Sequence, residues 1–154
     1  MLDTHHTPRE PHHTQLIPST RRVVATIRRL VQRAQQHADQ EDSTIAVPLS
    51  AELSRLHEHL VRDYATVEVS SLYQEVPRHH PRFSRTLDTL KSCHTQTLRE
   101  LRDILDELWW ADWADTPVGI VARVNRLLDQ IERVDTHENE ILQKSANQDL
   151  PAVD

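Results

Sequence analysis

The chain has 154 residues, enough for one domain with a sizeable core, and its net charge is −6 with the histidines neutral. This negative charge argues against nucleic acid as a partner, and no stretch approaches the roughly 18 apolar residues that a membrane span needs. The single glycine and the abundance of leucine, alanine, arginine and glutamate favour helices over a sheet. With one cysteine, Cys93, and no secretory signal pattern at the N-terminus, we expect a cytoplasmic protein.

Residues 1–17 are rich in histidine and show no periodic apolar pattern, so we expect them to form a disordered tail. The first helix is predicted from Ser19, a residue suited to the N-cap position, to about Asp39. Its inward apolar stripe consists of Val24, Ile27, Val31 and Ala34. Arginines at positions 21, 22, 28, 29 and 33 cover much of the remaining helix surface.

The second helix is predicted from Pro48, which suits the first turn of a helix, to the proline-rich turn PRHHP at 77–81. The apolar stripe of this helix is formed by Leu49, Leu53, Leu56, Leu60 and Val67. Asp63 occupies the stripe position between Leu60 and Val67, where an apolar side chain is expected.

The third helix is predicted from Phe83 to Leu108, with leucines three or four residues apart along most of its length. His94 interrupts this stripe between Leu90 and Leu98. A buried imidazole costs free energy unless it is hydrogen-bonded or binds a ligand, so His94 is expected to have a partner.

A fourth helix is predicted after a tryptophan-rich connection and extends to about Lys144. Its stripe consists of Ile120, Val124, Leu127, Ile131, Val134 and Ile141. Glu138 stands in this stripe between Val134 and Ile141. Four long helices with short connections predict an all-α fold, an antiparallel up-down-up-down four-helix bundle over 18–148, followed by a flexible tail over 149–154.

The three polar stripe residues are expected to meet inside this bundle. Asp63 lies about 14 residues before one turn and His94 about 13 after it, and Glu138 matches the height of His94 to within roughly one helical turn. A histidine and two carboxylates that converge in a bundle are typical of iron, manganese or zinc sites. The alternative is a metal-free, hydrogen-bonded triad in which a carboxylate holds a protonated His94.

Three stretches of the chain are similar to one known family: DYATVEVSSLYQE at 63–75, LDTLKSCHTQTLREL at 87–101 and IERVDTHENEILQKSANQDL at 131–150. Over about residues 20 to 148 the chain resembles the hemerythrin-like, or HHE cation-binding, domain. The resemblance implies a four-helix bundle with a non-haem di-iron centre, associated with oxygen binding, oxygen or redox sensing, and iron handling.

The ligand pattern implied by this resemblance is only partly kept. His94 matches a family histidine and Glu138 the glutamate of the last helix, while Asp63 stands where the family has a histidine. Val67 replaces a glutamate and Val134 replaces a histidine. We therefore expect Asp63, His94 and Glu138 to hold one divalent cation, iron by resemblance, or none.

Glu68, next to Val67, is expected to point away from the apolar stripe. Tryptophans at positions 109, 110 and 113 are expected to plug the end of the bundle, and if exposed they would form a surface for a protein partner.

The resemblance implies a non-enzymatic cation-binding protein that binds or senses oxygen or redox state through a degenerate centre. The alternative function is that of a metal-free, helical-bundle protein-interaction module.

Overall fold

The computed structural model describes residues 16–36, 45–110 and 118–148. Within these ranges the chain forms helices and no strand, so the prediction of an all-α protein is confirmed. The elements are α1 (Pro18–Gln36), α2 (Ala46–Glu68), α3 (Ser71–Gln74), α4 (Val76–His79), the 3-10 helix η1 (Pro81–Phe83), α5 (Ser84–Trp110) and α6 (Val118–Gln148).

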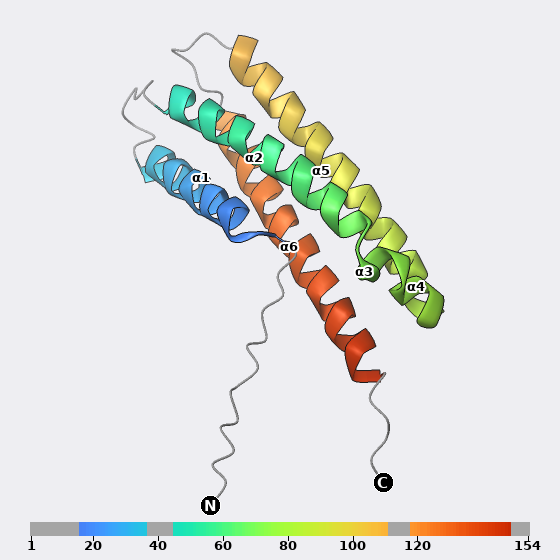
Figure 1. The fold of residues 1–154 in the computed structure, drawn as a ribbon. Coiled ribbons are helices and arrows are strands. Elements are labelled where there is room, and N and C mark those ends of the chain that lie inside the picture. The colour runs from blue at the N-terminus through green and yellow to red at the C-terminus, as the bar shows by residue number, and fades with distance from the viewer. Residues whose placement is uncertain (1–15, 37–44, 111–117, 149–154) are drawn as a thin grey trace, which may run out of the picture.

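The long helices α1, α2, α5 and α6 lie side by side, and the short helices α3 and α4 form the corner between α2 and α5 (Figure 1). Helix α1 packs against α2 and α6, and α5 packs against the same two helices from the other side. None of the described helices is both long and apolar enough to cross a membrane.

The second helix is shorter than predicted, because α2 ends at Glu68 instead of continuing to the prolines. Ser70 is extended, with φ −75° and ψ 169°, and its hydroxyl donates to the carbonyl oxygen of Val67 at 2.5 Å. A serine that hydrogen-bonds to nearby backbone competes with the helical hydrogen bonds, which accounts for the break. The last predicted turns of this helix form α3 and α4 instead.

The first helix begins at Pro18, so Ser19 lies inside the helix and is not its N-cap as predicted. Proline is suited to this position because the first turn of a helix needs no backbone N–H donor. Leu16, placed in the tail by the sequence, is 4% exposed and belongs to the core. Residues 1–15, Asp39 and the tail over 149–154 lie outside the described residues.

The core consists of two apolar clusters. The larger one joins α1, most of α2, the C-terminal half of α5 and the N-terminal half of α6. The smaller one contains Val67, Leu72, Val76, Leu87, Leu90, Val134 and Ile141. Between the clusters lie the buried polar residues Thr20, Asp63, His94, Thr97 and Glu138. Most of the apolar stripe positions predicted from the sequence are therefore buried, and the polar exceptions Asp63, His94 and Glu138 are buried as well.

Candidate functional site

His94 lies at the centre of the polar layer, on α5, and is 2% exposed. Its Nε2 atom is 2.6 Å from Oε1 of Glu138 on α6, and its Nδ1 atom is 3.0 Å from Oε1 of Glu68 on α2. A neutral imidazole has only one N–H, whereas two ionised carboxylates require two donors. The arrangement is therefore satisfied by the imidazolium form, which donates to both glutamates.

An aromatic ring covers one face of His94. The ring of Tyr64, on α2, is stacked on the imidazole with centroids 4.0 Å apart and an angle of 11° between the planes. Burial raises the pKa of Tyr64, so its ring remains a neutral phenol at ordinary pH. A cation over the face of an aromatic ring is attracted by the ring's quadrupole, and this contact favours the charged form of His94.

The pKa of His94 results from opposing effects. Burial alone lowers it, but the hydrogen bonds to Glu138 and Glu68 and the charges of both carboxylates outweigh burial. The net result is that the pKa of His94 is raised above its ordinary value. Opposite charges and hydrogen bonds to the charged form are expected to act in this direction.

Glu138 connects His94 to a second tyrosine. Its Oε1 atom also accepts a hydrogen bond of 3.1 Å from the hydroxyl of Tyr73, which lies on the short helix α3. Burial and the nearby charge of Glu138 raise the pKa of Tyr73, so its hydroxyl stays protonated and keeps donating. Glu138 is 1% exposed, and these two donors compensate for the removal of its carboxylate from water.

Asp63 belongs to a different hydrogen-bonded group. Its Oδ2 atom accepts a hydrogen bond of 2.6 Å from the hydroxyl of Thr20 on α1, and that hydroxyl oxygen is also 3.4 Å from Nδ1 of His59. Nearby, the backbone N–H of Leu16 donates to Oδ1 of Asp135 on α6 at 3.1 Å. Asp63 therefore fixes the start of α1 against α2.

Of the three residues predicted to converge, the structure pairs His94 with Glu138 and gives Asp63 another partner.

A small cavity lies between these two hydrogen-bonded groups. It has a volume of about 10 Å³, and Asp63, Asp135 and Glu138 are among the residues that line it. This volume corresponds to about one water molecule. Tyr64, Val67 and Val134 form other parts of the wall.

The expectation that Glu68 points away from the apolar stripe is wrong. Glu68 is the last residue of α2, and its long side chain reaches Nδ1 of His94 with 27% of the side chain exposed. Sequence reasoning also missed the hydrogen bond from Tyr73 and the stacking of Tyr64. Both tyrosines lie in the stretch 63–75 that carries the family resemblance, and a tyrosine beside a buried carboxylate is a signal for such contacts.

The donor groups present do not fit a metal centre in this geometry. A metal ion binds the lone pair of a ring nitrogen, but both ring nitrogens of His94 face carboxylates at hydrogen-bonding distance. Across residues 16–36, 45–110 and 118–148, no group of three or more histidine, cysteine, aspartate or glutamate side chains is arranged to hold a metal ion. Val67 and Val134 are 4% and 6% exposed and pack in the smaller apolar cluster.

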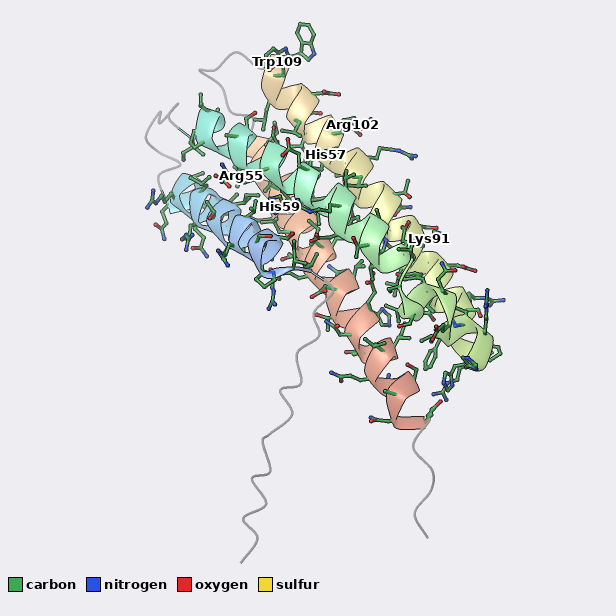
Figure 2. All side chains as sticks on the ribbon, in the orientation of Figure 1. Arg55, His57, His59, Lys91, Arg102 and Trp109 are labelled. Carbon is green, nitrogen blue, oxygen red and sulfur yellow. The ribbon has the colours of Figure 1, made fainter. Side chains whose placement is uncertain are left out.

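The tryptophans at the end of α5 do not plug the bundle as predicted. Trp109 is 73% exposed and Trp110 is 84% exposed, and Figure 2 places Trp109 at the outer end of α5. Trp113 lies outside the described residues.

Comparisons with protein-family models, curated protein sequences and solved structures gave no match. The hemerythrin-like resemblance therefore rests on the residues of the chain itself.

Proposed function

We propose that the chain is a divergent hemerythrin-like protein that works without a metal, as a protein-interaction module. The proposed arrangement is an antiparallel up-down-up-down four-helix bundle. It is supported by the cyclic order of helix contacts, in which α1 and α5 each pack against both α2 and α6. The alternating course of successive long helices in Figure 1 supports it further.

The observation that carries the proposal is the pair of carboxylates on His94. Glu138 and Glu68 take the two positions at the ring through which a histidine could ligate a metal. A proton on each nitrogen and a carboxylate opposite each proton give a complete set of hydrogen bonds without any ion. In this proposal the polar layer holds α2, α5 and α6 in register, which is a structural role.

The two valines at family donor positions support the same reading. The resemblance implies a glutamate at position 67 and a histidine at position 134, but valine cannot coordinate a cation. Both valines instead contribute to the smaller apolar cluster. Valine in place of the implied glutamate and histidine removes two metal ligands and adds apolar contacts to the core. This is the change expected when a bundle loses its metal and keeps its fold.

The surface proposed to contact a protein partner is the pair Trp109 and Trp110. Both indoles are largely exposed, although tryptophan normally buries much of its large apolar area. Tryptophan is also enriched among the residues that dominate binding energy at protein interfaces. Two adjacent exposed tryptophans therefore favour a contact with another protein at this end of α5.

A second candidate function is weak binding of one divalent cation, with iron favoured by the family resemblance. Asp63, Asp135 and Glu138 all line the small cavity and carry the oxygen ligands that hard cations prefer, although these side chains would have to move to enclose an ion. His94 would be a ligand only if its Nε2 proton were displaced. Retention of iron that depends on these carboxylates would favour the second candidate over the first.

Replacing both tryptophans tests the interaction function. Partners captured by the wild-type protein after crosslinking in its native cells should be lost with Trp109→Ser/Trp110→Ser, because the exposed indoles supply the contact area. The matched control is Val47→Ser/Val69→Ser, which also removes two exposed apolar side chains, 60% and 75% exposed, elsewhere on the surface. Equal capture by the tryptophan variant and the wild type would contradict the proposed surface.

A further inference from the structure

Helix α1 carries an unusual concentration of positive charge for a protein with a net charge of −6. Its sequence, PSTRRVVATIRRLVQRAQQ, contains five arginines and no acidic residue. One of them, Arg28, contacts α6. The other four, Arg21, Arg22, Arg29 and Arg33, are exposed, and no carboxylate among the described residues forms an ion pair with them.

Three of these arginines form a stripe. With about 100° per residue, Arg22, Arg29 and Arg33 fall within an arc of about 40°, on the side opposite the buried Ile27 and Val31. Along the axis they are spaced by about 10.5 Å and about 6 Å, at a rise of 1.5 Å per residue. We call these three residues the arginine stripe. It faces outward along most of α1.

The molecule shows how an arginine of α1 recognises a facing helix. The guanidinium of Arg28 is 3.0 Å from Asp129 and 2.9 Å from Glu132, two acids three residues apart on α6. Acids three or four residues apart share one face of a helix. The arginine stripe presents the same group at helical spacing, with no described carboxylate opposite it.

We propose that the arginine stripe is a docking surface for an acidic helix of a protein partner, with carboxylates three, four or seven residues apart. This surface is separate from Trp109 and Trp110 and goes beyond the function proposed for them. Guanidinium groups match carboxylates in a planar, two-pronged geometry. An acidic helix that packs along α1 would place its carboxylates opposite the arginine stripe, because both helices have the same spacing of residues along the axis.

Other anionic partners fit this surface less well. The apolar side of α1 is buried in the core, so this side is not available to enter a lipid surface as an interfacial helix requires. Asp129 and Glu132 on α6, 57% and 52% exposed in their side chains, pair with Arg28 on the same helix α1. These acids and the overall negative charge oppose the continuous phosphate backbone of a nucleic acid. A short acidic helix would contact only the arginine stripe and would not have to extend over these acids.

Binding of a defined peptide to the full chain tests this inference. The probe is a fluorescent helical peptide with glutamates at positions 1, 5 and 12, to match the stripe, and its lysine-substituted version is the negative control. Anisotropy should show binding that weakens with added salt. Arg22→Glu/Arg29→Glu/Arg33→Glu should weaken it by about tenfold or more.

The matched control variant is Arg62→Glu/Arg85→Glu/Arg102→Glu, which makes the same charge change at exposed arginines on α2 and α5. It should bind the peptide as the wild type does, or within about threefold. Circular dichroism checks that both variants are folded. No binding of the glutamate peptide, or equal loss in both variants, overturns the inference. Tighter, stripe-dependent binding of duplex DNA or of phosphatidylserine vesicles overturns it in favour of that partner.

Discussion

Replacing Glu138 with leucine is expected to destabilise the protein by about 2–4 kcal/mol. Glu138 accepts hydrogen bonds from Nε2 of His94 and from the hydroxyl of Tyr73, and it is 1% exposed. Its removal leaves two donors without an acceptor, one of them on a buried cationic ring. Leucine has a similar volume, so the loss reports on hydrogen bonds and charge more than on a cavity. The measurement is the free energy of unfolding in urea at neutral pH.

The matched control is Glu140→Leu, which removes an exposed carboxylate from the same helix and should change stability by less than about 0.5 kcal/mol. Adding His94→Leu to Glu138→Leu should restore part of the loss, because the unpaired ring is then gone. If Glu138→Leu alone were as stable as the wild type, the hydrogen-bonded pair of His94 and Glu138 would not contribute to stability as described.

The stability of the protein is expected to fall as the pH rises above neutral, through the loss of the His94 proton. The folded-state pKa of His94 is raised, whereas the unfolded chain has the ordinary value of about 6.5. The folded state therefore binds more protons in this range. The contribution is complete below about pH 6.5 and disappears as the pH rises through the folded pKa, with a slope of up to about 1.36 kcal/mol per pH unit.

This pH dependence is measured by urea unfolding from below pH 6 to above pH 9. His94→Gln should lose the part of the slope that comes from the imidazole, because glutamine does not titrate. His137→Gln, an exposed position on the same helix as Glu138, serves as the control and should keep the wild-type slope. Identical slopes in the wild type and in His94→Gln would show that His94 is not held in its charged form.

Much of the helical framework could be predicted from the sequence because the apolar spacing is regular. The leucines of α2 at 49, 53, 56 and 60 are fully buried, as their spacing of three and four residues indicates. The same pattern placed Asp63, His94 and Glu138 inside, and all three are buried. Periodicity reports which face of a helix is covered, so it identified the polar layer.

The partners within that layer could not be predicted in the same way. The position of a residue along the helix axis predicts which residues of neighbouring helices lie at the same level. The direction and length of each side chain then decide which of them are in contact. Thr20 on α1 donates a hydrogen bond to Asp63, and the long side chain of Glu68 reaches His94 from the end of α2. The early end of α2 at Glu68 depends on Ser70, whose local hydrogen bond is not visible in the apolar pattern.

The sequence does not predict the exposure of the tryptophans, for a similar reason. Aromatic residues near a helix end are consistent both with a plug and with a surface patch, since both suit a large amphipathic side chain. In the structure α5 continues through Trp110, and the side chains of Trp109 and Trp110 are exposed there.

The measurement that tests the metal-free account most directly is iron binding by the full chain. The tail histidines are removed first by His5→Ser, His6→Ser, His12→Ser and His13→Ser, since clustered histidines take up divalent metals. The protein is loaded anaerobically with ferrous iron, exposed to air and desalted. Bound iron is counted by elemental analysis, and the visible spectrum is recorded. Val67→Glu/Val134→His in the same background is the positive control, because it restores two donors that the family resemblance implies.

If the protein works without a metal, the chain with its native core should show background iron and no visible absorption, and the control variant should take up more iron. Retention of one iron per chain that is lost with Asp63→Asn or Glu138→Gln would contradict the metal-free function and favour the single-cation site. Two irons per chain with oxo-to-iron charge-transfer bands would contradict the hydrogen-bonded arrangement of His94 itself.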